Sequence, residues 1–202
     1  TPAWTMTDQA MRADAAIALL GRSREHGLDP DDYDEQDIIR LRSLLTGEDA
    51  PEPGSEEGAR ALAQADVRIT AALLTLGRDV AIGRTKPERI EPQWKGRRQA
   101  PDLVSALGTA VERGVTTWLD TIKPKHAQYA ALQKALTDPA MLQHTDQIAL
   151  NLERWGWMPD DLGTRHIVVN IPSFHLEAHE NGQTVLQMKV VVGKPDHKTP
   201  VF

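Results

Sequence analysis

The hydrophobic period of the chain changes once, near Pro159, and this change limits the possible folds more than any other feature. Before it, apolar residues recur every three or four positions, as on the buried face of a helix. After it, apolar and polar residues alternate, as in a strand with one buried face. The sequence therefore predicts an α+β chain, mostly helical, that ends in a short β-hairpin or sheet segment.

The first two helical segments are bounded by capping and breaking residues. Asp8 can cap the first segment, which Gly27 can end, and Asp34 can begin the second, which ends near Gly47. Their apolar positions predict the buried faces: Met11, Ala15, Ile17, Ala18 and Leu19 in the first, and Ile38, Ile39, Leu41, Leu44 and Leu45 in the second.

A long third helix is predicted after an exposed loop. Residues 47–58 are rich in Pro, Gly and Glu, which is typical of a loop, and Gly83 can end the helix that follows. The apolar stripe of this helix comprises Leu62, Ala65, Ile69, Leu73, Leu76 and Val80.

Shorter helices are predicted in the next stretch of chain. Asp102 can cap a segment through Val111, after residues that Pro87, Pro92 and Pro101 keep irregular. Further helices are expected around Trp118, over residues 129–136 and over residues 139–154.

The β segment contains a clear hairpin signal. Asn181 and Gly182 suit a type I′ turn, in which both residues need positive φ. Alternation places Phe174, Leu176 and Ala178 on one face, together with Leu186, Met188, Val190 and Val192 of the return strand; His175, Glu177 and His179 lie on the other. About three strands with one apolar face are too few to be stable alone. We expect the preceding helices to cover this face, or a second copy to pair with it in a strand-mediated dimer.

Composition excludes several classes of function. The net charge of -6 argues against nucleic-acid partners. The chain has no cysteine, and no apolar run approaches the roughly 18 residues of a membrane span. It begins at Thr1 without a secretion signal, so we expect processing or trimming, with an apolar export segment encoded upstream.

Several groups of residues could bind ligands. His175, Glu177 and His179 could hold zinc, but the alternation already explains them as the solvent-facing side of a half-buried hairpin, which is the favoured interpretation. Trp155 and Trp157 could form a sugar-binding surface or fill the junction between helix and strand. Lys95–Arg98 could contact an anionic polymer or a carboxylate, or form a short solvated loop. Glu153 and Arg154 could contact substrate or form a local ion pair at a helix end. Residues 29–37 are interpreted as a turn and a helix start, and Trp94 and Trp118 as core or loop-anchoring residues.

Residues 149–163 and 167–202 closely resemble the start of the catalytic domain in large murein L,D-transpeptidases. The motifs that carry this resemblance are Asn151–Trp157, Val169–Pro172, Val191–Lys194 and Thr199–Pro200. The helical part resembles the N-terminal scaffold of the same proteins through Gly27–Asp29 with Tyr33, Asp66–Leu74, Gly83–Arg84 and Pro92–Trp94.

The resemblance implies a peptidoglycan cross-linking enzyme with a cysteine acyl-enzyme mechanism. The family nucleophile belongs to a Ser-His-Gly-Cys type motif that does not occur in these residues, so no catalytic, cofactor-binding or metal residue is assigned. The peptidoglycan-binding module that many relatives carry between scaffold and catalytic domain is also missing, since about a dozen residues separate Leu136 from Leu150.

These inferences give three regions: a helical scaffold over residues 1–138, a connecting helix over 139–158, and the first strands of an incomplete catalytic domain over 159–202. The expected partners are peptidoglycan stem peptides, acted on by the parent protein in the periplasm or cell envelope, with a role in cell shape. The alternative is a non-catalytic cell-wall-binding or protein-interaction module. A third is an unrelated helical domain. The chain alone is expected to be inactive.

Overall fold

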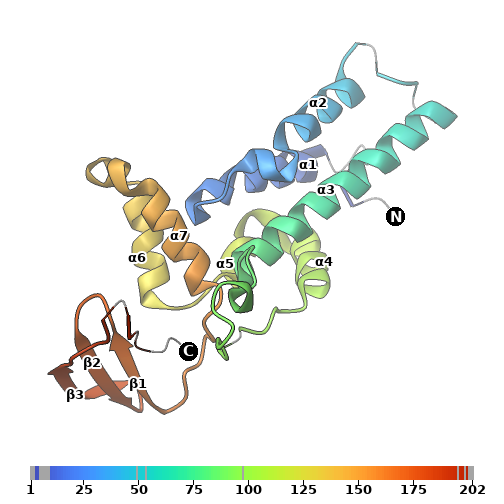
Figure 1. Cartoon of the computed structure of the whole chain (residues 1–202). Coiled ribbons are helices and arrows are strands. Elements are labelled where there is room, and N and C mark those ends of the chain that lie inside the picture. The colour runs from blue at the N-terminus through green and yellow to red at the C-terminus, as the bar shows by residue number, and fades with distance from the viewer. Residues whose placement is uncertain are drawn as a thin grey trace. The chain divides into compact units, whose positions relative to one another are not determined.

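The computed structural model describes residues 3–4, 10–48, 50–52, 54–96, 98–194, 196–197 and 199. They belong to two compact units: Thr1–Thr85 with Arg98–Trp157, and Lys86–Arg97 with Met158–Phe202. The first unit is helical and the second contains a three-stranded sheet, so the predicted α+β class is confirmed (Figure 1). Asp8, Arg97, Pro195, residues 200–202 and the side chain of Met11 lie outside the described part.

The helical unit alternates α-helices with short 3-10 helices. Its elements are α1 (Ala10–Gly21), η2 (Arg22–His26), η3 (Pro30–Tyr33), α2 (Glu35–Thr46), α3 (Glu56–Ile82), α4 (Leu103–Arg113), η5 (Val115–Thr117), α5 (Trp118–Ile122), α6 (Ala127–Leu136), η6 (Pro139–His144) and α7 (Thr145–Trp155). In the described part of the chain, no helix is both long enough and apolar enough to cross a membrane.

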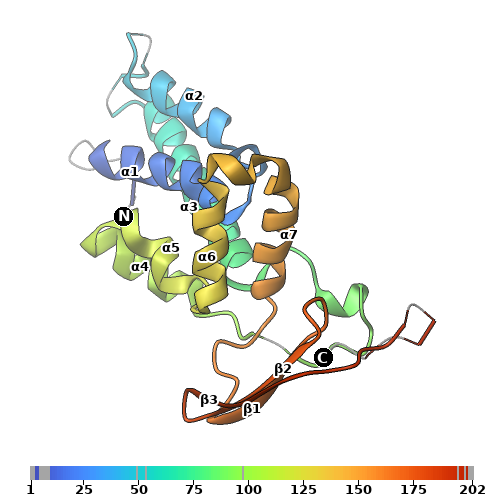
Figure 2. The same cartoon turned by 90° about the vertical axis from the view of Figure 1, so that its left-hand side faces the viewer.

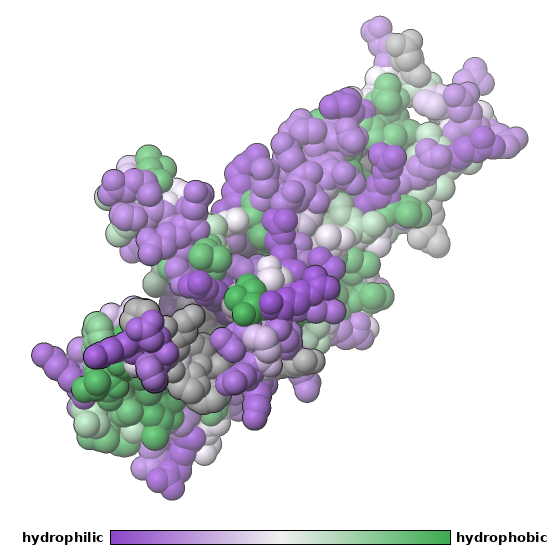
Figure 3. Space-filling view, viewed as in Figure 1, coloured by the Kyte–Doolittle hydropathy of each residue, from purple (hydrophilic) through white to green (hydrophobic). Residues whose placement is uncertain are grey.

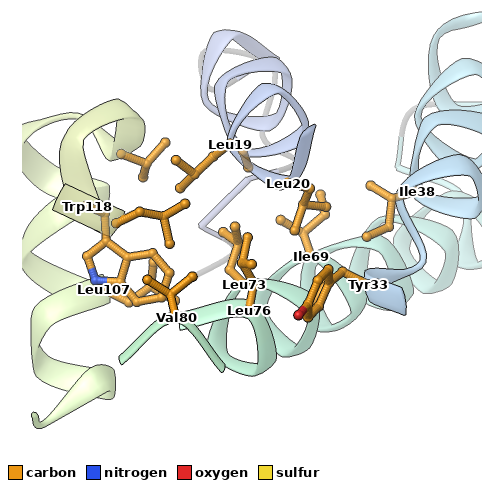
Figure 4. Packing of buried hydrophobic residues seen from close by; sticks show 14 of the residues in the cluster. Leu19, Leu20, Tyr33, Ile38, Ile69, Leu73, Leu76, Val80, Leu107 and Trp118 are labelled. Atoms are coloured by element: carbon orange, nitrogen blue, oxygen red, sulfur yellow. The ribbon is translucent and has the colours of Figure 1, made fainter. Parts of the chain in front are cut away.

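The long helix α3 carries the core of this unit. Its buried stripe includes Ile69, Leu73, Leu76 and Val80, as the sequence predicts. Side chains from α1, α4 and α5 converge on that stripe (Figure 4). Trp118 of α5 is packed against α3 so closely that a Cβ atom on Gly77 would lie 2.3 Å from its ring.

A smaller apolar cluster joins α6 and α7, which lie side by side in both views (Figures 1 and 2). Tyr129 of α6 and Ile148 and Leu152 of α7 form its buried part, and Trp155 packs against it.

Helix boundaries follow local capping groups. Asp102 accepts the backbone N–H of Ser105 at 3.1 Å, as predicted, and Gly83 ends α3 with φ 77°. Ser55 accepts the N–H of Gly58 at 3.0 Å, so α3 begins at Glu56, inside the predicted loop.

Three predictions about the helices are wrong. The single helix expected from residue 139 to 154, within the connecting helix 139–158, is a 3-10 helix followed by α7; the Thr145 hydroxyl bonds the Leu142 carbonyl at the break. The buried residues of α1 are Ala13, Ala16, Leu19 and Leu20, so Leu19 alone is buried among the predicted apolar positions whose side chains are described. In α2, only Ile38 of the predicted apolar set is buried.

The second unit contains η4 (Pro87–Arg89) and an antiparallel sheet of order β1-β2-β3, made by Arg165–Asn170, His175–Glu180 and Gln183–Lys189. The predicted turn is confirmed, with φ 51° at Asn181 and 77° at Gly182. A register shift lies between Ala178 and His179.

The predicted strands are too long at the open end of the hairpin. Phe174 has φ 56°, a left-handed conformation that an extended strand does not contain, so β2 begins only at His175. Strand β3 ends at Lys189, opposite His175, and Val190 and Val192 lie beyond it.

Candidate functional site

The helical unit contains a partly open cavity of about 270 Å³. Segments far apart in sequence form it: the end of η2 with the residues after it, the end of α3 with the residues after it, Tyr129 of α6, and α7. Its lining residues are His26, Gly27, Leu28, Asp79, Val80, Arg84, Thr85, Tyr129, Ala149, Leu152 and Glu153. Six of these lining residues have polar side chains, and the others are apolar or glycine.

Glu153 attaches α7 to the segment that follows α3. Its carboxylate accepts the backbone N–H of Arg84 at 3.0 Å and of Thr85 at 2.7 Å, and the Trp157 indole N–H lies 3.3 Å away. Gly83 and Gly156 allow this approach, since a Cβ on Gly83 would lie 2.8 Å from the Glu153 carboxylate and one on Gly156 would lie 2.8 Å from the Gly83 nitrogen. The predicted helix-end ion pair of Glu153 and Arg154 is wrong, because main-chain donors bind the carboxylate.

His26 is a buried neutral donor in the cavity wall. The Nδ1 atom of His26 lies 2.7 Å from the Tyr129 hydroxyl oxygen and 3.4 Å from the Gln133 amide nitrogen. Because an amide N–H can only donate, we assign Nδ1 as the acceptor and place the proton on Nε2. Among the described residues, Nε2 has no hydrogen-bond partner. Burial, with Lys123 nearby, lowers the pKa of His26 to about 4.

Asp79 is held in a buried network. It accepts the Tyr33 hydroxyl at 3.1 Å and pairs with Arg78 at 2.6 Å. Burial next to Asp79 raises the pKa of Tyr33, so the phenol stays protonated and remains a donor. Tyr33 thus connects the 3-10 helix η3 to the end of α3.

Arg84 is the only lysine or arginine among the cavity residues. One terminal nitrogen, Nη1, lies 2.8 Å from the Asp32 carboxylate. The side chain is half exposed, so its other guanidinium N–H groups and the hydroxyl of the exposed Thr85 are available as donors at the cavity rim.

The two histidines that could have bound zinc, His175 and His179, have different partners on the polar face of the sheet. His179 lies 3.2 Å from Glu177 and its ring stacks on His166, whereas His175 lies 2.8 Å from the Ser173 carbonyl. In the described part of the chain, no three His, Asp or Glu side chains are grouped to hold a metal ion. The predicted alternation of faces is confirmed.

Three of the tryptophans, Trp118, Trp155 and Trp157, pack inside the helical unit. Trp118 lies in the core, and Trp155 packs against the α6–α7 cluster and near His126, with ring centroids 4.7 Å apart. Trp157 is buried, and its carbonyl accepts the N–H of Arg98 at 3.2 Å.

The prediction of a solvated loop at Arg98 is wrong. Its guanidinium donates to the carbonyls of Ala81, Ile122 and Lys123, where α3 and α5 end. A cation at helix C-termini satisfies free carbonyls and complements the helix dipole. The acidic residues near Asp29 form the predicted turn, in which Asp29 caps η3.

The opposite face of the sheet is apolar and exposed. Cross-strand pairs place Ile167, Val169, Leu176, Ala178, Leu186 and Met188 on it. We call this set the apolar sheet face. Leu186 and Met188 are 52% and 49% exposed, and apolar side chains are visible over the strands in Figure 3. The cover expected for this face, by helices or by a second copy, stays a prediction.

Comparison with known families agrees with this architecture. A family model described as a scaffold domain matches residues 1–136, and one described as an L,D-transpeptidase catalytic domain matches residues 164–202. The chain therefore belongs to the L,D-transpeptidases that have an N-terminal scaffold domain, and it contains part of the catalytic domain. The resemblance predicted from the sequence motifs is confirmed. No curated protein and no solved structure matches the chain.

Proposed function

We propose that the protein to which this chain belongs cross-links peptidoglycan stem peptides through a cysteine acyl-enzyme, and that its nucleophile lies outside residues 1–202. The match of residues 164–202 to the L,D-transpeptidase catalytic domain is the observation that carries this proposal. The 202 residues contain no cysteine, which supports a nucleophile elsewhere in the protein.

The proposed reaction has two balanced steps. The thiolate attacks a peptide carbonyl of the donor stem, a thioester forms, and the amine of the cleaved bond leaves with a proton. The amine of a second stem then attacks the thioester, a new amide forms, and the thiolate is released. A nearby histidine takes and returns the proton.

The site of action follows from the substrate. Cross-linkable peptidoglycan lies outside the cytoplasmic membrane, so we propose that the protein acts in the periplasm or cell envelope and contributes to cell shape. The gene should then encode an apolar export segment upstream of Thr1. Locating an epitope-tagged protein by cell fractionation tests this, and a purely cytoplasmic protein would contradict it.

Intact-mass spectrometry of the full-length protein, incubated with a tetrapeptide-stem substrate, tests the mechanism. We expect an adduct with the mass of the acyl donor on one cysteine, lost when that cysteine is replaced by serine or alanine. A cross-linked product formed at the wild-type rate by a cysteine-free variant of the full-length protein would overturn the proposal.

The exposed apolar sheet face supports a further proposal. In the intact protein, later strands of the catalytic domain cover this face, whereas in the 202-residue chain it pairs with a second copy. Exposed apolar strands and unpaired strand edges favour such association.

A further inference from the structure

The wall of the cavity in the helical unit contains charged groups of both signs: the carboxylates of Asp79 and Glu153, and the guanidinium of Arg84. We propose that it binds a small zwitterion of the amino-acid type, with the ammonium group beside Glu153 and Asp79 and the carboxylate beside Arg84 and Thr85. This site belongs to the helical unit alone, so it does not depend on the proposed transpeptidase reaction.

The acidic side of the cavity can accept a cation. Both carboxylates line it, but only Asp79 has a cationic partner, Arg78. Among the described residues, no lysine or arginine forms an ion pair with Glu153, whose Oε2 accepts only the backbone N–H of Arg84. A carboxylate oxygen can accept more than one hydrogen bond, so Oε2 retains acceptor capacity for an ammonium group.

The basic side of the cavity can accept a carboxylate. Arg84 has five guanidinium N–H donors, and its partner Asp32 contacts only the Nη1 nitrogen. Thr85 adds a hydroxyl donor beside it. Because the main chain of both residues is bonded to Glu153, their side chains begin beside that carboxylate.

The size of the cavity limits the ligand. At about 270 Å³ it is just below the range of roughly 300–1,000 Å³ that is usual for ligand sites. Leu28, Val80, Ala149 and Leu152 offer apolar contact to a short side chain. His26, 3% exposed with an unpaired Nε2, adds a buried polar group in the same wall.

Titration with blocked amino acids tests the proposal. Alanine, alanine amide and N-acetylalanine are each titrated into the 202-residue chain, followed by ligand-observed NMR. Alanine amide lacks the carboxylate and N-acetylalanine lacks the ammonium group. We expect alanine to bind about two- to fivefold more tightly than either, since each blocked probe loses one charge contact. Alanylalanine is titrated in parallel. Its affinity relative to that of alanine shows whether the cavity prefers a free amino acid or a short peptide with the same two end charges.

Variants assign the two ends. Arg84→Gln keeps the backbone bond to Glu153 and should abolish the preference for alanine over alanine amide, whereas Arg113→Gln, an exposed arginine outside the cavity, should not. Glu153→Gln should weaken alanine and alanine amide but not N-acetylalanine; a thermal melt checks that it folds. Absence of alanine binding to the wild type, equal binding of a blocked probe, or equal effects of Arg84→Gln and Arg113→Gln would overturn the proposal.

Discussion

Glu153 and Arg84 are joined through the main chain, because the Glu153 carboxylate accepts the backbone N–H of Arg84 at 3.0 Å. The adjacent N–H of Thr85 donates to the same carboxylate at 2.7 Å. A side chain of α7 thereby fixes the segment that follows α3, although 69 positions separate the two residues.

Replacing Glu153 should weaken the fold. Glu153→Ala removes a charged acceptor from two backbone donors, and we expect the free energy of unfolding to fall by about 1–2 kcal/mol. The loss is smaller than for a fully buried group because the bonds are partly exposed. Urea unfolding measures it. Glu112→Ala, at an exposed position of α4, is the control and should change stability by less than about 0.5 kcal/mol. Equal effects of the two substitutions would contradict the role given to Glu153.

Two helical glycines should respond to alanine in opposite directions. In Gly77→Ala the new Cβ would lie 2.3 Å from the Trp118 ring, so overpacking should cost about 2 kcal/mol even after the gain in helix propensity. In Gly108→Ala the Cβ meets no atom within 4 Å, and the helix should gain about 0.5–1 kcal/mol. Thermal melts of both variants check this, and a stabilised Gly77→Ala would show that α3 and α5 are packed differently.

His26 should make the fold sensitive to acid. Its pKa is lowered from 6.5 to about 4 in the folded chain, so between these values the unfolded chain binds the extra proton. The stabilising contribution is therefore complete above about pH 6.5 and is lost as the pH falls toward 4, by roughly 3 kcal/mol in total. Unfolding free energies at several pH values should show a steeper loss for wild type than for His26→Gln. Parallel curves would contradict a buried, neutral His26.

The apolar sheet face should drive association of the 202-residue chain. We expect its sedimentation coefficient to rise with concentration, and Leu186→Lys, on that face, to suppress the rise. Gln187→Lys adds the same charge on the opposite face and should leave it unchanged. A wild-type chain that stays monomeric throughout would contradict the proposed pairing.

Regular patterns in the sequence predicted much of the fold. The stripe from Ile69 to Val80 and the Asn181–Gly182 turn depend on local spacing and backbone preference, and both are confirmed. The break at Thr145 depends on a side-chain hydrogen bond to the Leu142 carbonyl, and the left-handed conformation of Phe174 depends on the local backbone. The spacing of apolar residues encodes neither.

The cavity could not be predicted in the same way. Its wall joins residues from 26 to 153, and Glu153 and Arg84 become neighbours only through tertiary packing. Gly83–Arg84 and Asn151–Trp157 appeared as separate motifs. The signal that links them is the pair of glycines, Gly83 and Gly156, that permits the close approach.

The proposal that the nucleophile lies outside residues 1–202 is tested by the transpeptidase activity of the 202-residue chain, measured beside that of the full-length protein. Both are incubated with a tetrapeptide-stem substrate at equal molar concentration, and cross-linked product is quantified by mass spectrometry. We expect product from the full-length protein and none above a buffer control from the 202-residue chain, which has no cysteine. Product formed by the 202-residue chain at a rate similar to that of the full-length protein would contradict it.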